Sequence, residues 1–173
     1  MPKLIPDAKD KIILTARKHL FEKGYARLNL REVAEQCGLA VGTIYNYFPG
    51  KDMLVASIMA EDWLTSLQEM RQSCQIAATI EQGVRSIYCA IGDYVQTYEK
   101  VWKAYKGVLS GFGERHVLLR SQLAGLLSDL LERHGRKDDV ELCPLLAETV
   151  LACAMQKDID FMVLSKTVQR LFS

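Results

Sequence analysis

Apolar residues recur along this chain at intervals of three and four positions, which is the period of an amphipathic helix. The clearest stripes are Ile13, Ala16 and Leu20; Ile80, Val84, Ile87 and Ile91; Leu119, Leu123, Leu126 and Leu130; and Phe161, Leu164, Val168 and Leu171. No segment of useful length alternates apolar and polar residues with a period of two, as a half-buried strand would. The pattern therefore predicts an all-α fold of about nine helices.

Glycine and capping residues predict where several of these helices begin and end. We expect the first helix to follow Asp7 as its N-cap and to stop at Gly24. Asn29 is expected to cap the next helix, and Glu32 three residues later completes a capping-box-like pattern. Further along, a separate short helix is predicted over residues 101–109, before a pair of glycines.

Residues 29–54 have the layout of a helix-turn-helix: a short helix, a turn containing Gly38, and a second short helix. In the second helix, Ile44 and Phe48 lie four positions apart and are expected to be buried. The other positions offer hydroxyls, an amide and two phenols in place of the long polar side chains that usually solvate a helix. They are Val41, Gly42, Thr43, Tyr45, Asn46 and Tyr47. Groups of this kind donate to phosphates and contact base edges.

Three residues of this segment are explained better by a bound polyanion than by local helix stability. Gly42 inside a helix costs about 1 kcal/mol relative to alanine, which indicates close approach of a partner to its backbone. Arg31 and Lys51 each stand in the first turn of a helix, where a cation opposes the helix dipole but would grip a phosphate. A generic three-helix subdomain whose tyrosines are partly core has the same spacing, so both interpretations stay open.

Composition excludes several function classes and leaves this choice unchanged. The net charge is +1, divided between +3 for residues 1–50 and −2 for residues 51–173, which fits a polyanion partner or ordinary solvated surface. Five cysteines and three histidines show no zinc-ligand spacing, and no apolar run approaches the ~20 residues that span a bilayer. Paired carboxylates in an apolar setting, a nucleophile motif and a Gly-rich phosphate loop are also missing. We therefore expect a reduced, cytoplasmic protein with no membrane partner, metal, cofactor or enzyme activity.

The run from Leu30 to Leu54 resembles the DNA-binding signature of the TetR family of transcriptional regulators, and the resemblance covers about residues 9–55. The matching positions are Gly24, Tyr25, Val33, Ala34, Gly38, Gly42, Thr43, Ile44, Tyr45, Tyr47, Phe48, Lys51 and Leu54. The resemblance implies that base edges or the nearby backbone are contacted by Val41, Gly42, Thr43 and Asn46. It implies that phosphates are bound by Tyr45, Tyr47 and Lys51, with further phosphate contacts from Asn29 and Arg31.

Three positions depart from the family pattern. Ala40 stands where serine usually caps the second helix, which can cost about 1 kcal/mol. Leu28 replaces a common threonine or serine, and one possible phosphate contact is missing with it. Gly50 replaces the usual serine, asparagine or aspartate before Lys51, and glycine is an acceptable cap. These departures affect the expected affinity and leave the family pattern in place.

The resemblance also implies the domain organisation. Residues 1–53 would form the helix-turn-helix domain, and residues 54–173 an effector-binding domain that forms a homodimer through its last two long helices. Small residues in 147–154 and the apolar side of the final helix fit such an interface, and packing of both helices within one subunit fits equally well. A dimer would match a palindromic operator, since one helix-turn-helix reads a half-site.

An effector pocket would be built from the apolar interior of the C-terminal body. Candidate lining residues are Trp63, Tyr88, Cys89, Trp102, Tyr105, Phe112, Met155 and Phe161. Each of them is also explained as ordinary core, and an apolar or aromatic effector is what their chemistry would favour. The function expected is a DNA-binding repressor released from its operator by a small effector. The alternatives are a non-catalytic interaction module with a vestigial helix-turn-helix and an all-helical enzyme.

Overall fold

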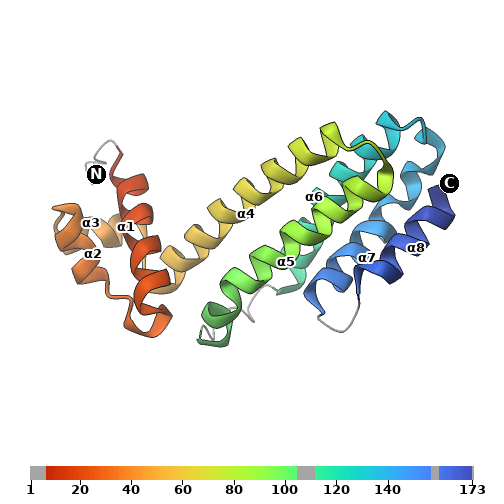
Figure 1. Ribbon diagram of the computed structural model, residues 1–173. Coiled ribbons are helices and arrows are strands. Elements are labelled where there is room, and N and C mark those ends of the chain that lie inside the picture. The colour runs from red at the N-terminus through yellow and green to blue at the C-terminus, as the bar shows by residue number, and fades with distance from the viewer. Residues whose placement is uncertain (1–6, 105–111, 157–159, 173) are drawn as a thin grey trace. The chain divides into compact units, whose positions relative to one another are not determined.

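The computed structural model describes residues 7–104, 112–156 and 160–172, and every regular element within them is a helix (Figure 1). The α-helices are α1 Ala8–Lys23, α2 Leu30–Cys37, α3 Val41–Tyr47, α4 Lys51–Ile76, α5 Ile80–Ala104, α6 Phe112–Arg133, α7 Cys143–Met155 and α8 Phe161–Phe172. Two 3-10 turns, η1 Tyr25–Arg27 and η3 Lys137–Leu142, complete the order. The expected all-α class is confirmed. A search of the described helices finds none long and apolar enough to cross a membrane.

The chain folds into two compact units that share the two longest helices. The first unit comprises the chain up to Trp63 together with a stretch that begins at Tyr98 on α5. The second comprises Leu64–Thr97 and the chain from Leu109 onward. Both α4 and α5 therefore contribute residues to each unit, and the expected functional division at residue 53 stays a prediction.

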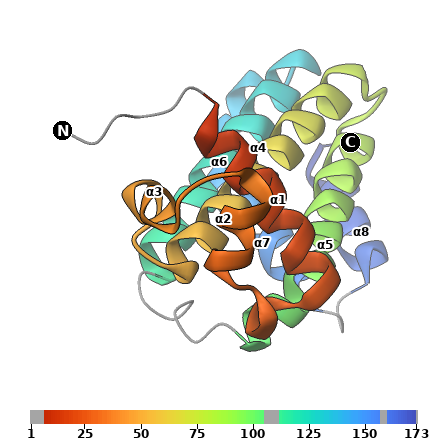
Figure 2. The same cartoon turned by 90° about the vertical axis from the view of Figure 1, so that its left-hand side faces the viewer.

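Helices α1, α2 and α3 of the first unit form the expected helix-turn-helix. α2 packs against both α1 and α3, and Figure 2 shows these three helices at the front of the view. Ile13, Val33 and Ile44 contribute one buried side chain from each helix, with 0–1% of their surface exposed. Gly24 and Gly38 end α1 and α2 with φ of 79° and 65°, a left-handed conformation that favours glycine.

The second unit is organised around α6 and α7, which pack along each other, with α8 packed against α7. Its interior is aliphatic, and Leu123, Leu127 and Val150 are wholly buried. Polar contacts add to this packing where α5 meets α8: the Ser165 hydroxyl donates to a Glu81 carboxylate oxygen at 2.7 Å. That hydrogen bond is the main cause of a lowered pKa for Glu81.

The structure departs from two expectations about helix ends. The expected break before residue 101 is absent, because α5 continues without interruption from Ile80 to Ala104, and residues 105–109 of the expected helix lie outside the described part of the chain. Tyr98 and Val101 lie three positions apart, and both are buried, so the apolar stripe of α5 simply runs on. Helix α1 begins directly after Asp7, as expected, but the Asp7 side chain makes no capping hydrogen bond. The Asp7 backbone is left-handed, at φ 61°, whereas a capping residue is normally extended.

A polar network inside the first unit connects α1, α4 and α5. The Arg17 guanidinium of α1 contacts two acids of α4, Asp62 at 2.6 Å and Glu61 at 3.2 Å. The buried hydroxyl of Tyr98, on α5, donates to the other carboxylate oxygen of Asp62. The ring of Phe21, on α1, packs against the Tyr98 ring with centroids 5.7 Å apart. One buried side chain of α5 is thereby bound to both α1 and α4.

We expect Tyr98→Phe to lower the free energy of unfolding by about 1–2 kcal/mol, because a buried hydrogen bond to a charged carboxylate is lost. Urea denaturation followed by circular dichroism measures the change. Tyr45→Phe is the matched control, since Tyr45 is 52% exposed, and it should shift the free energy by less than about 0.5 kcal/mol. Equal stability of wild type and Tyr98→Phe would show that the network does not hold the three helices together.

Candidate nucleic-acid interface

Helix α3 has seven residues and is held to the domain through one face only. Ile44 is fully buried, and Phe48, which follows the helix, is 3% exposed. The predicted DNA-facing residues lie on the remaining surface: exposed are Gly42, Tyr45 and Asn46, and half-buried are Val41, Thr43 and Tyr47. Ala40 precedes the helix without a side-chain capping bond, as expected. The outward face therefore carries backbone, hydroxyl, phenol and amide groups and no charged side chain.

The fold itself does not require glycine at position 42. An ideal Cβ built on Gly42 would meet no atom within 4 Å, and the residue is exposed. Alanine would favour this helix by about 1 kcal/mol. What glycine adds here is room for another molecule against the backbone of α3.

The start of α2 is capped as predicted, but the expected capping box is absent. The Asn29 side-chain oxygen accepts a hydrogen bond from the Arg31 backbone N–H at 2.9 Å. Glu32 does not return to the backbone of Asn29. Its carboxylate accepts instead from the Lys23 ammonium of α1 at 2.7 Å, and it lies 3.9 Å from Nδ1 of buried His19. The hydrogen bond and charge of Lys23 lower the pKa of Glu32.

The start of α4 is clamped to the η1 turn through Tyr25. The Lys51 ammonium donates to the Tyr25 backbone carbonyl at 2.9 Å and lies 4.3 Å from the centre of the Tyr25 ring. The Tyr25 hydroxyl donates in turn to Asp52. Lys51 was expected to bind a phosphate, which stays a prediction, and the structure adds two contacts within the protein: a carbonyl and an aromatic face both hold the cation in place.

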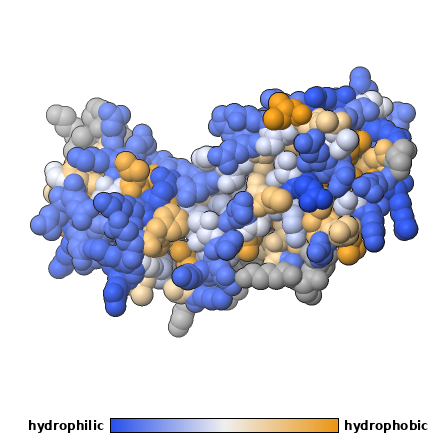
Figure 3. Space-filling model, in the orientation of Figure 1, coloured by the Kyte–Doolittle hydropathy of each residue, from blue (hydrophilic) through white to orange (hydrophobic). Residues whose placement is uncertain are grey.

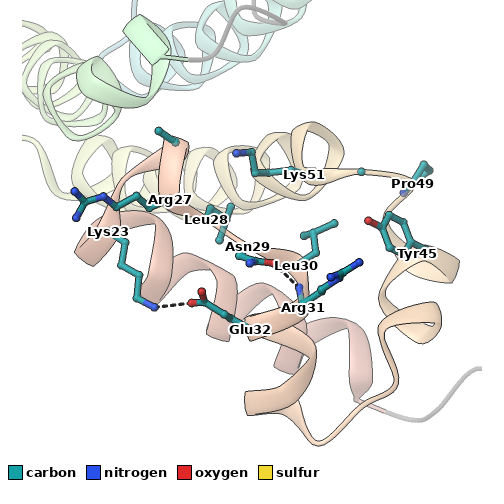
Figure 4. A pocket seen from close by; sticks show the side chains of 12 residues that line it. Lys23, Arg27, Leu28, Asn29, Leu30, Arg31, Glu32, Tyr45, Pro49 and Lys51 are labelled. Atoms are coloured by element: carbon teal, nitrogen blue, oxygen red, sulfur yellow. Dashed lines mark hydrogen bonds and ion pairs between the residues drawn. The ribbon is translucent and has the colours of Figure 1, made fainter.

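An open hollow of about 780 Å³ lies among these groups, next to the N-termini of α2 and α4. Its walls come from the η1 turn, the first turn of α2, residue 45 of α3 and residues 49–51 (Figure 4). Four predicted phosphate-binding residues line it, namely Asn29, Arg31, Tyr45 and Lys51. Free N–H groups at a helix N-terminus favour anions, and cationic side chains beside them strengthen that preference.

Two basic residues that the sequence did not indicate also line this hollow, Lys23 and Arg27. Lys23 ends α1 and Arg27 lies in the η1 turn, outside the residues from which the helix-turn-helix pattern was inferred. The hollow thus holds four cationic side chains and one carboxylate, that of Glu32. The available signal was the presence of two basic residues, Lys23 and Arg27, shortly before Asn29, but helical periodicity does not predict where the side chains of a turn lie.

The predicted effector-pocket residues are distributed over both units. The first unit holds Trp63, which is buried, and Trp102, whose ring lies 6.4 Å from that of Tyr98. In the second unit Tyr88 and Phe161 are brought together, with ring centroids 5.1 Å apart. Cys89 and Met155 are exposed on the second unit. Outside the described residues lie Tyr105 and the side chain of Phe112. The pocket remains a prediction.

The structure places most of the cysteine thiols in the protein interior. Four of the five cysteines are buried. Burial raises the pKa of Cys74 to about 11, and it raises the pKa of Cys143 and Cys153 as well, so these thiols stay neutral. Within the same described residues no group of three or more His, Cys, Asp or Glu could hold a metal ion.

Residues 12–58 match the family model of the bacterial regulatory proteins of the tetR family. This N-terminal segment of the chain is therefore similar to the TetR family. Relatives named for transcriptional regulation match as well: HbdR of Aromatoleum sp. (strain CIB) is 28% identical over 122 residues, which is 69% of this chain and 52% of that protein. The transcriptional repressor KstR of Rhodococcus jostii (strain RHA1) is 44% identical over 54 residues, 31% of this chain and 26% of that protein. The chain thus spans about half or less of the length of these TetR-family relatives.

A solved structure shares the fold of nearly the whole chain. The transcriptional regulator FadR from Bacillus subtilis, crystallised in complex with stearoyl-CoA, covers 94% of this chain and 96% of its own with a TM-score of 0.54. The sequence identity is 21%, so the likeness concerns the fold. The helical body beyond residue 58 therefore shares the fold of this structure.

We expect the Lys23–Glu32 pair to stabilise the first unit above about pH 4.5 and to lose that effect as the pH falls through the lowered pKa of Glu32. The difference in unfolding free energy between wild type and Glu32→Gln should be constant from pH 6 to 8 and should vanish in acid. Urea titrations at several pH values measure it. Glu35→Gln, an exposed glutamate of the same helix, should show no such pH dependence. A difference that persists in acid would contradict the ion-pair explanation.

Proposed function

We propose that this protein is a transcriptional repressor that binds a palindromic operator as a homodimer and is released by a small effector. The observation that carries the proposal is the outward face of α3, which is free of charged side chains and has a glycine that the fold does not require. That face lies beside a basic hollow at the start of two helices. Together these features supply direct readout and phosphate binding.

In this proposal α3 enters the major groove. The hydroxyl of Thr43 and the amide of Asn46 reach base edges, and Gly42 lets the backbone of α3 approach the DNA. Val41 adds an apolar contact of the kind made with a thymine methyl group. Phosphates on either side are bound by Tyr45, Tyr47, Lys51, Asn29 and Arg31. These phosphate contacts set the register of the helix, and the base contacts select the sequence.

A homodimer is proposed because one α3 reads only a half-site, and exposed apolar side chains on α7 and α8 support it. Leu145 on α7 is 69% exposed, and Met162 and Val163 on α8 are 62% and 60% exposed. The small residues of 147–154 divide between core and surface. Ala147 and Cys153 are buried in the core of their own unit, whereas Ala152 and Ala154 are half-buried beside the larger apolar residues.

Release by an effector is proposed to act through α4, which runs without interruption from Lys51 at the interface into the second unit. Arg17 and Tyr98 support this route, because both are bound to Asp62 of α4. An effector that prefers one tilt of α4 would shift the population away from the DNA-competent state, provided its affinities for the two states differ strongly. We propose an apolar or aromatic effector, and stearoyl-CoA is the first compound to test, since the FadR of the same fold was crystallised with it.

We also propose that the protein acts in the cytoplasm, where the DNA is, and that it has no catalytic activity. The neutral, buried thiols support the second statement. Residues 54–173 then serve effector binding and dimerisation.

The central test is an operator selection from a random duplex pool, followed by Gly42→Ala. We expect the variant to be as stable as wild type or up to about 1 kcal/mol more stable, because alanine favours the helix. Its affinity for the selected operator should fall at least tenfold, because a methyl group enters the α3–DNA contact. Fluorescence anisotropy and urea denaturation measure the two effects.

Gly125→Ala is the matched control for this test. Gly125 is also an exposed helical glycine with no atom within 4 Å of an added Cβ, but it lies on α6. It should gain similar stability and keep full DNA affinity. A folded dimer that selects no duplex at all would instead indicate an interaction module with a vestigial helix-turn-helix.

We expect Val163→Glu to convert the dimer into a monomer, because a charge placed on an apolar contact face must be desolvated on association. Sedimentation velocity measures the mass, and circular dichroism checks that the helices remain. Val117→Glu on α6 is the control, since Val117 is 54% exposed, and it should remain dimeric. A dimeric Val163→Glu would place the subunit contact elsewhere.

A further inference from the structure

The four cations of the basic hollow are not equally available to an anion. Lys23 is paired with Glu32, and its ammonium nitrogen lies 2.7 Å from a carboxylate oxygen of that residue. The charges of these two residues largely cancel. Lys51 keeps its charge, but one of its N–H donors is directed at the carbonyl of Tyr25. Half of the positive side chains of the hollow are therefore already engaged within the protein.

The two arginines of the hollow are in the opposite situation. Arg27 and Arg31 are both exposed, and neither guanidinium has a hydrogen bond or ion pair with another described residue. Their backbone N–H groups are used within the fold, that of Arg27 to the Gly24 carbonyl and that of Arg31 to the Asn29 side chain. A guanidinium offers five donors in a planar fork that suits the oxygens of a phosphate.

The two side chains lie at opposite ends of the hollow. Figure 4 shows Arg31 extending toward the Tyr45 side and Arg27 extending away from it, beyond Leu28, on the η1 turn. One phosphate would not occupy both ends, since each guanidinium is directed to a different side. The arrangement suits two phosphates of a nucleic-acid backbone that passes across the first turn of α2.

We propose that Arg27 binds a DNA backbone phosphate of its own, additional to the phosphates bound by Arg31, Tyr45 and Lys51. This inference rests on the proposed DNA-binding function and extends the protein's footprint on the duplex by one phosphate. Arg27 contributes to affinity for any sequence, because a phosphate contact carries no base information. Each phosphate neutralised by a cation adds about 0.9 to the slope of log K against log salt concentration.

The experiment measures binding of the full-length chain to its selected operator and to a scrambled duplex of equal length, between 50 and 300 mM KCl. Arg27→Ala should lower affinity for both duplexes by about the same factor, five- to twentyfold at 100 mM, and should reduce the slope by about 0.9. Arg27→Lys keeps the charge and should retain the wild-type slope. Thermal unfolding of Arg27→Ala should match wild type, since the side chain has no partner among the described residues.

Lys18→Ala is the matched control for loss of one positive charge. Lys18 lies on α1, its side chain is 71% exposed, and it only approaches Glu22 at 4.0 Å. Its removal should change affinity less than twofold and leave the slope intact. An equal effect of Lys18→Ala and Arg27→Ala would show that Arg27 acts only through net charge, and it would overturn the proposal.

The remaining outcomes separate this inference from the proposed function. If Arg27→Ala keeps the wild-type slope while Arg31→Ala reduces it, the protein binds DNA without Arg27, and the inference is wrong. A clear drop in the unfolding temperature of Arg27→Ala would assign the arginine a structural role and would also refute it. If the wild-type protein binds neither duplex even at 50 mM KCl, the proposed function itself fails.

Discussion

The burial of Ile44 and Phe48 is the contact on which the candidate interface depends. A helix of seven residues is too short to be stable in water by itself, so α3 exists because these two side chains anchor it to the domain. Using one face for anchorage leaves Gly42, Tyr45 and Asn46 exposed. The outer face can then carry Gly42 and small polar groups that contribute little to folding.

The same domain is tied to the longer helices by polar contacts. Lys51 and Asp52, the first residues of α4, are held by Tyr25, while Asp62, further along, is held by Arg17 and Tyr98. Helix α4 is thus attached to the helix-turn-helix at two points about three turns apart. Under the proposed function, a tilt of a helix attached in this way would be transmitted to α1, α2 and α3 together.

Helix ends and caps were predicted correctly where a single residue or spacing decides the local structure. Gly24 and Gly38 end helices because their backbones are left-handed, and Asn29 caps α2 with its own side chain. Such predictions were wrong where a residue distant in the sequence competes for the same side chain. Glu32 was expected to cap its own helix, yet the ammonium of Lys23 on α1 offers a charge-assisted hydrogen bond, about twice as strong as a neutral one. The predicted helix break before residue 101 is absent because Tyr98 and Val101 remain buried on one continuous face of α5.

The sequence by itself determined the helix-turn-helix and the outward face of α3, because helical periodicity, glycine turns and caps act over a few neighbouring residues. The positions of Asn29, Arg31, Tyr45 and Lys51 around one hollow follow from the fold that brings α2, α3 and α4 together. Only the tertiary structure decided which charges are free. The partners of Lys23 and Lys51 lie nine and 26 residues away in the chain, and a side chain's availability depends on neighbours in space. Arg27 stands out for the same reason: the fold supplies partners to the lysines of the hollow and none to this arginine among the described residues.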